Sequence, residues 1–89
     1  MRRANHRLEA NGEVFYFLYD RDQPDELHIA VRHRTEPLEA IETFFDGETS
    51  WNEQRKRFET MTATHGIYWV RVPEDQGVLI ISCFRTGDE

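Results

Sequence analysis

The sequence predicts an α+β fold: a small antiparallel sheet of about four strands with two short helices packed on one face. The first observation is the apolar, β-branched run at residues 77–85, which is typical of a strand inside a sheet. The second is period-two alternation in earlier segments, and the third is helical spacing between residues 24 and 46. The 89 residues are predicted to form one domain, 1–89, in which residues 1–12 are either a flexible arm or part of a hairpin.

Three further strands are predicted before the apolar run. An aromatic-rich strand at residues 13–19 follows the turn dipeptide Asn11-Gly12, so residues 7–10 are placed to pair back on it as a hairpin. Residues 55–64 alternate with period two and are rich in threonine, which favours a strand. Residues 67–72 form the next strand, and a short hairpin loop joins it to the apolar run.

Two short helices are predicted between the first strand and the later ones. The first begins at Pro24, with Asp22 or Asp25 as its N-cap. Its apolar positions are Leu27, Ala30 and Val31. The second has Thr35 as its N-cap and ends at Gly47, for which a left-handed conformation is expected. Its apolar positions are Leu38, Ile41, Phe44 and Phe45. Residues 48–54 follow as a predicted loop.

The charge of the chain is unfavourable for a nucleic-acid-binding protein, because contacts to phosphates need a positive surface. Seventeen acidic and 11 basic residues give a net charge of −6. The basic residues nevertheless cluster in three places: Arg2-Arg3, residues 32–34 and residues 55–57. On charge alone, a solvated surface of mixed charge and a local phosphate-binding surface remain equal alternatives.

Several classes of protein are not indicated. No apolar run approaches the roughly 20 residues of a membrane span, and there is no signal-type segment, so a cytoplasmic protein without membrane contact is predicted. The single Cys83 cannot form an internal disulfide and is expected to be a buried apolar thiol. The four histidines lack metal-ligand spacing and no Gly-rich phosphate loop exists, so neither a metal nor a cofactor is predicted.

Two segments resemble a known family. Residues 28–33 (HIAVRH) lead into residues 39–46 (EAIETFFD), as "HIxRHGV" leads into "EEAxxvFxD" in the BrnT-type toxins of the RelE/ParE superfamily. The similarity continues through Arg57-Phe58-Glu59 and the Gly-aromatic segment at residues 66–69, and covers roughly residues 26–86. The chain departs from the family pattern at Arg34-Thr35, near the end of the apolar run, and in its negative charge. The resemblance implies a ribosome-independent endoribonuclease toxin that pairs with a DNA-binding antitoxin protein.

Cleavage of RNA by its own 2′-hydroxyl needs a base, an acid and cationic stabilisation of the phosphorane. His33 matches the family's histidine, and its neighbours Arg32 and Arg34 could hold a phosphate. Arg55 and Arg57 lie two apart on one side of a predicted strand, and Arg85 ends the apolar run where the family has an arginine. The predicted catalytic residues are therefore His33, Arg57 and Arg85, and the predicted substrate-binding residues are Arg32, Arg34 and Arg55.

Each of these residues also has a purely structural interpretation. His33 could be a helix-end histidine, Arg55 and Arg57 surface charges, and Arg85 half of an ion pair at the rim of the core. His65, at a turn, is not expected to be catalytic; Trp69 is expected in the core, and Trp51 is the more accessible ring for a base.

Two functions from different classes thus remain: a toxin-like endoribonuclease, and a non-catalytic acidic protein-interaction module of the same fold. They differ in whether the candidate arginines and His33 converge in space. Convergence is required for the enzyme, and scatter favours the module. A homodimer that pairs through an exposed strand edge is compatible with either function.

Overall fold

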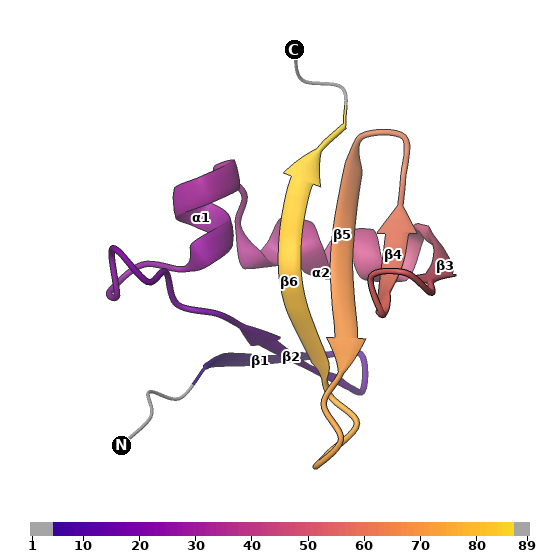
Figure 1. Cartoon of the computed structure of the whole chain (residues 1–89), viewed down its shortest axis with the longest axis horizontal. Helices are drawn as coiled ribbons and strands as arrows, with labels where there is room; N and C mark the ends of the chain where they lie inside the picture. Colours follow the sequence, from indigo (N-terminus) through magenta and orange to yellow (C-terminus); the bar gives the residue numbers. More distant parts are fainter. Residues whose placement is uncertain (1–4, 87–89) are drawn as a thin grey trace.

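The computed structural model of the chain describes residues 5–86, which form a six-stranded sheet and two helices (Figure 1). Residues 1–4, including the basic pair Arg2-Arg3 of the predicted arm, lie outside the described residues. In chain order the elements are β1 (His6–Ala10), β2 (Glu13–Phe17), α1 (His28–His33), α2 (Pro37–Asp46), β3 (Glu48–Asn52), β4 (Arg57–Met61), β5 (His65–Arg71) and β6 (Val78–Arg85).

The order of strands in the sheet is β1-β2-β6-β5-β4-β3. Strands β3 to β6 form a consecutive antiparallel meander that follows the two helices, and the β1–β2 hairpin joins this meander through a parallel pairing of β2 with β6. The α+β class is therefore right, but the prediction of an antiparallel sheet of about four strands is wrong: the sheet has six strands and is mixed.

Two features account for this error. The segment predicted to be a loop, residues 48–54, contains β3, whose sequence ETSWN is polar and lacks an apolar face because four of its five residues are exposed. The pairing of β2 with β6 joins segments about 60 residues apart in the chain, and no local pattern encodes such a pairing. The hairpin prediction is confirmed: β1 pairs with β2, and Asn11 and Gly12 both adopt the positive φ that a tight primed turn requires.

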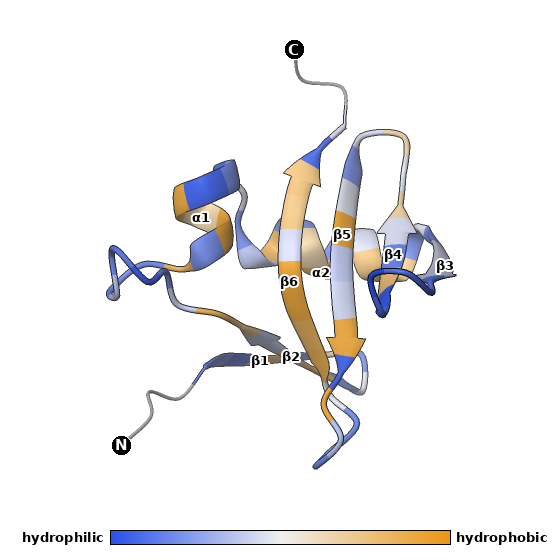
Figure 2. Cartoon of the chain, viewed as in Figure 1, coloured by the Kyte–Doolittle hydropathy of each residue, from blue (hydrophilic) through white to orange (hydrophobic). Residues whose placement is uncertain are grey.

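Strand β6 lies inside the sheet, between β2 and β5, as its continuous apolar run predicts. Figure 2 shows the hydrophobic colour along β6 and the hydrophilic colour in the turn between β3 and β4. The core lies between the sheet and α2, which runs across one face of β6, β5 and β4 (Figure 1). Its fully or almost fully buried apolar side chains are Phe15, Phe17, Ile29, Ala40, Ile41, Ile67, Trp69, Val78, Ile80 and Cys83.

Helix α2 begins one residue later than predicted. Its N-cap is Glu36, which forms a capping box with Glu39, and Pro37 occupies the first turn. Thr35 is instead fully buried, with its Oγ1 3.2 Å from the Ile29 carbonyl oxygen and 3.1 Å from that of Cys83, so it fastens the helical segment to β6. Gly47 closes the helix in an extended conformation (φ −91°), and the prediction of a left-handed cap is wrong.

Helix α1 also starts later than predicted, at His28 and not at Pro24. The buried Asp20 organises the preceding segment: its carboxylate accepts hydrogen bonds from the backbone N–H groups of Asp22 and Gln23, both at 3.0 Å. A carboxylate that accepts backbone N–H bonds in this way stabilises a turn and not a helix start. Neither Asp22 nor Asp25 caps α1; its N-cap is Leu27, which makes no side-chain capping bond.

Candidate functional site

The face of the sheet opposite α2 carries a row of polar and aromatic side chains, which we call the open face; at its centre lie Tyr68, Ser82 and Phe84. Tyr68 lies between the buried Ile67 and Trp69, and strand alternation therefore directs it away from α2. Ser82 precedes the buried Cys83 and is directed the same way. Tyr68 and Ser82 are direct partners in the register of β5 and β6, so their side chains are neighbours across the two strands.

His33, the last residue of α1, joins this row. Its Nε2 lies 3.1 Å from Oγ of Ser82, within hydrogen-bond distance. Burial, followed by the positive charge that the nearby His28 can carry, lowers the pKa of His33 below its ordinary value. The two imidazole rings are 6.1 Å apart. The lowered pKa favours the neutral form of the His33 imidazole, which is able to accept a proton.

Arg57 reaches the same row from β4. Its guanidinium carbon lies 3.5 Å from the centre of the Tyr68 ring, a cation–π contact. Its Nε donates a hydrogen bond to Glu59 at 2.9 Å, and both side chains are mostly covered. A hydrogen bond from the Asn52 amide, and then the one from Arg57, lower the pKa of Glu59, which keeps this carboxylate charged. The row on the open face therefore runs from His33 of α1 through the neighbours Ser82 of β6 and Tyr68 of β5 to Arg57 of β4.

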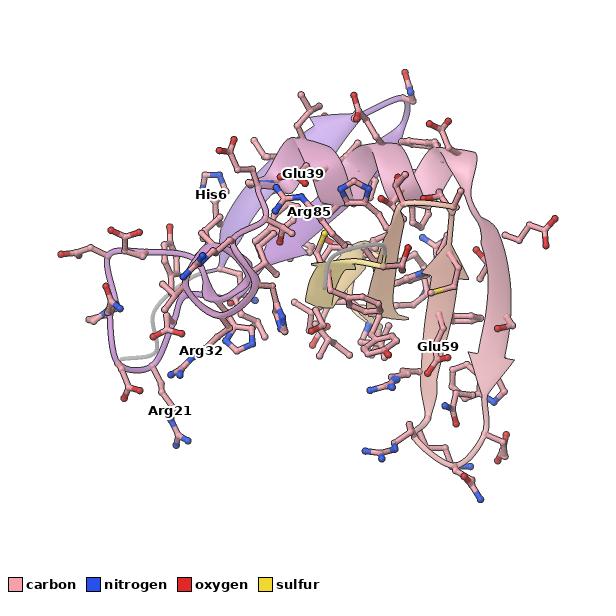
Figure 3. The ribbon with its side chains drawn as sticks, turned by 90° about the horizontal axis from the view of Figure 1, so that it is seen from above. His6, Arg21, Arg32, Glu39, Glu59 and Arg85 are labelled. Carbon is pink, nitrogen blue, oxygen red and sulfur yellow. The ribbon has the colours of Figure 1, made fainter. Side chains whose placement is uncertain are left out.

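Arg85 is not part of this row. Figure 3 shows Arg85 beside Glu39 of α2, whereas Glu59 of β4 lies away from α2. The cause is an irregularity in β6: Tyr68 pairs with Ser82 but Trp69 pairs with Ile80, so Ile81 is an extra residue. A bulge of one residue exchanges the two faces of a strand beyond it. Arg85 consequently projects toward α2, and the predicted catalytic set of His33, Arg57 and Arg85 does not assemble.

Arg85 belongs instead to a second polar cluster around Glu39. The Glu39 carboxylate accepts hydrogen bonds from Nη2 of Arg85 at 2.9 and 3.0 Å and from Nε2 of His65 at 2.9 Å. The other ring nitrogen of His65, Nδ1, lies 2.8 Å from Oγ1 of Thr64. This cluster ties the start of α2 to the ends of β5 and β6. Nothing in the sequence marks it except the capping-box position of Glu39, and sequence reasoning missed both Glu39 and His65.

A cavity of about 310 Å³ adjoins this second cluster, between α2 and the turn that joins β4 to β5. Carboxylates and hydroxyls dominate its lining, which consists of Glu39, Glu42, Thr43, Asp46, Thr62, Ala63, Thr64 and His65. No arginine or lysine lines it, so its chemistry suits a cation better than a phosphate. Within residues 5–86, no group of three or more metal-ligating side chains is assembled.

The Glu39 cluster makes stability depend on pH. Burial raises the pKa of Glu39, but the hydrogen bonds from His65 and from the Glu36 N–H, together with the charge of Arg85, outweigh it, so the pKa lies below its ordinary value. A carboxyl with a lowered folded pKa stabilises the fold above its unfolded pKa, and this contribution is lost as the pH falls through the folded pKa. We expect Glu39→Gln to be less stable than the wild type at pH 7 and to lose less stability on acidification.

Urea unfolding at pH 7 and at about pH 3 tests this expectation, since the stabilisation by the Glu39 carboxylate is lost as the pH falls through its folded pKa. Glu42→Gln, on the same helix and the same cavity wall, is the matched control, because Glu42 has no hydrogen bond or ion pair among the described residues. Equal acid sensitivity of Glu39→Gln and wild type would contradict the assigned role of Glu39.

The three predicted substrate-binding arginines lie apart from one another. Arg32 donates from Nε to the buried Asp20 at 3.0 Å and from Nη2 to Asp22 at 2.7 Å, which makes it part of the segment before α1. Arg34 is exposed, in the left-handed conformation that ends α1. Arg55 lies in the turn between β3 and β4 and not on a strand, so the predicted clamp of Arg55 and Arg57 on one side of a strand is wrong.

Sequence reasoning also missed Ser82 and Tyr68, which the structure places between the two predicted residues that do converge. Both lie inside strands with apolar neighbours, and their role follows only from the pairing of β5 with β6. The expectations for Cys83 and Trp69 are confirmed, since both side chains are buried. In the described part of the chain, no helix has the length and apolar character needed to cross a membrane.

Comparisons of this chain with protein-family models, with curated proteins and with solved structures gave no match. The similarity to BrnT-type toxins therefore stays a prediction that rests on the quoted segments and on the order of elements.

Proposed function

We propose that the protein is a toxin-like endoribonuclease that acts in the cytoplasm without a metal and is held inactive by an antitoxin protein. One observation carries the proposal: the His33 imidazole, whose pKa is lowered by burial, lies beside the Ser82 hydroxyl on the open face, in a row that ends at the Arg57 guanidinium. His33 and Arg57 would supply the base and the cation that cleavage of RNA by its own 2′-hydroxyl requires, and water would supply the acid.

In the proposed reaction, a 2′-hydroxyl of the RNA takes the place of Ser82 at Nε2 of His33, which removes its proton. The 2′-oxygen then attacks the adjacent phosphorus, the bond to the 5′-oxygen breaks, and that oxygen takes a proton from water. The products are a 2′,3′-cyclic phosphate and a 5′-hydroxyl. Arg57 stabilises the negative charge of the phosphorane, and its planar fork suits two phosphate oxygens.

Arg85 has no part in this reaction, because Glu39 holds it on the α2 side of the sheet. The row on the open face also offers ring surfaces to RNA bases. The rings of Tyr68 and Phe84 are 5.0 Å apart, and Phe84 packs over the backbone of Gly66. An open sheet face with aromatic side chains is a common platform for single-stranded RNA.

A second candidate function is the non-catalytic acidic interaction module, and two observations favour it. Arg32, Arg57 and Arg85 each pair with a carboxylate, which offsets the attraction of their positive charge for a phosphate. The net charge is −6, and of the three predicted catalytic residues only His33 and Arg57 share a surface. The proposal of a nuclease therefore depends only on the row of side chains from His33 to Arg57 on the open face.

Inducible expression in bacteria separates the two candidates. We expect wild-type protein to arrest growth with decay of total RNA, and His33→Ala to relieve both effects. His65→Gln is the matched control, because it alters an imidazole on the opposite side of the sheet, and it should still arrest growth. Normal growth and intact RNA with soluble, folded wild-type protein would reject the nuclease and favour the interaction module.

A further inference from the structure

Within residues 5–86, strand β3 is an edge of the sheet, and its backbone has no strand partner on one side. It pairs with β4 only and is the last strand in the sheet order. Residues 48–51 are exposed, and the Trp51 side chain is 48% exposed. Natural proteins usually protect such an edge with a proline, a lysine, a bulge or a covering segment. Strand β3 has no proline or lysine, and its register with β4 is regular.

The sequence of β3 is complementary to itself when a second copy runs antiparallel about Ser50. Ser50 then faces Ser50 of the second copy, Thr49 faces Trp51, and Glu48 faces Asn52. An aromatic ring opposite a β-branched residue is a favourable cross-strand pair. No two like charges are opposite each other, because the only charged side chain, Glu48, faces a neutral amide.

We propose that the protein forms a homodimer in which β3 pairs antiparallel with β3 of a second copy, centred on Ser50, so that the two sheets become one. The pairing satisfies the free backbone groups of both edges and covers both Trp51 rings. A contact through two five-residue strands is small, which makes the dimer weak and dependent on concentration. The proposed dimer does not rest on the proposed nuclease, because none of His33, Ser82, Tyr68 and Arg57 belongs to β3. The two meet only where Asn52 of β3 donates a hydrogen bond to Glu59, the partner of Arg57.

Strand β1 forms the other edge of the sheet, but we assign the interface to β3. Strand β1 carries the charged side chains Arg7 and Glu9, which help to protect an edge, whereas Glu48 is the charged side chain of β3. In addition, Arg7 and Glu9 of β1 already pair with each other at 2.7 Å within the chain.

Cysteine trapping tests the register directly. Centred on Ser50, the pairing brings the two Cα atoms of residue 50 to about 4.5–5.5 Å, within disulfide range, and holds those of residue 48 well beyond 7 Å. Under mild oxidation we expect Ser50→Cys to form a covalent dimer at least about ten times faster than the control Glu48→Cys. The native Cys83 is buried and does not interfere. Equal rates for the two variants would overturn the proposed register.

Sedimentation velocity on the protein without added cysteines is the second test of the proposed dimer. The wild type should shift from monomer to dimer as its concentration rises, and Ser50→Lys should remain monomeric because two like charges then lie directly opposite. Glu48→Lys, which faces Asn52, should still dimerise. A wild type that stays monomeric up to about 1 mM, a concentration at which a contact worth only about 4 kcal/mol forms, would reject the dimer. A Ser50→Lys variant that dimerises like the wild type would place the interface elsewhere and also reject it.

Discussion

The Phe15→Ala variant is expected to lose about 3–5 kcal/mol of unfolding free energy, the usual cost of removing a fully buried aromatic ring. Phe15 is 0% exposed, and its ring packs edge-on against Phe44 and Phe45 of α2 at 5.2 and 5.9 Å. Phe15 belongs to β2, which pairs with β6, so its ring helps to hold the β1–β2 hairpin against both α2 and β6. The loss is a large part of the roughly 5–15 kcal/mol that stabilises a domain of this kind.

Urea unfolding followed by circular dichroism measures this loss. Leu38→Ala is the control, because Leu38 also belongs to the apolar positions of α2 but is 63% exposed, and its removal should change stability by no more than about 0.5 kcal/mol. Similar destabilisation by the two substitutions would show that the hairpin is not packed on α2 as described.

The second large effect is expected at Arg57. If Arg57 stabilises the phosphorane on the open face, Arg57→Ala should lower the rate of RNA cleavage by about 10²–10³-fold, as loss of one such electrostatic group does in other enzymes. Arg57→Lys should recover only part of the rate, because lysine keeps the charge but not the planar fork. The measurement is single-turnover cleavage of a labelled RNA oligonucleotide by purified protein.

Arg21→Ala is the matched control for this experiment. Arg21 is exposed in the segment before α1 and points away from the sheet (Figure 3), so its removal changes net charge equally without touching the row. An Arg57→Ala variant that is folded and retains the wild-type rate would remove Arg57 from the site, whatever the result for His33. Equal losses for Arg57→Ala and Arg21→Ala would indicate a general effect of charge on RNA binding.

The candidate site was only partly predictable from sequence. His33 and Arg57 were selected by their chemistry and by the family resemblance, and they do meet on one surface. The extra residue Ile81 in β6 decided the place of Arg85: without that bulge, strand alternation from the buried Ile80 would put Arg85 on the open face. A bulge depends on how two strands fit together, so no single segment reveals it.

The sequence by itself determined the elements whose signals are local. The continuous apolar run made β6 a buried inner strand, and Asn11-Gly12 made the β1–β2 hairpin. Pro37 and the spacing of apolar residues made α2. Each of these elements depends on interactions between residues close in the chain or on the burial of an apolar segment. Both leave a pattern that can be recognised in the sequence.

Only the tertiary structure decided the rest. A polar segment became the edge strand β3 because β4 offered it hydrogen-bonding partners, and the hairpin joined β6 in parallel because Phe15 and Phe17 could be buried under α2. The same packing separated Arg85 from His33 and brought Ser82 and Tyr68 between His33 and Arg57. These outcomes arise from contacts between residues distant in the chain. Such contacts stabilise the structure only when folding has brought the residues together, so no local sequence pattern records them.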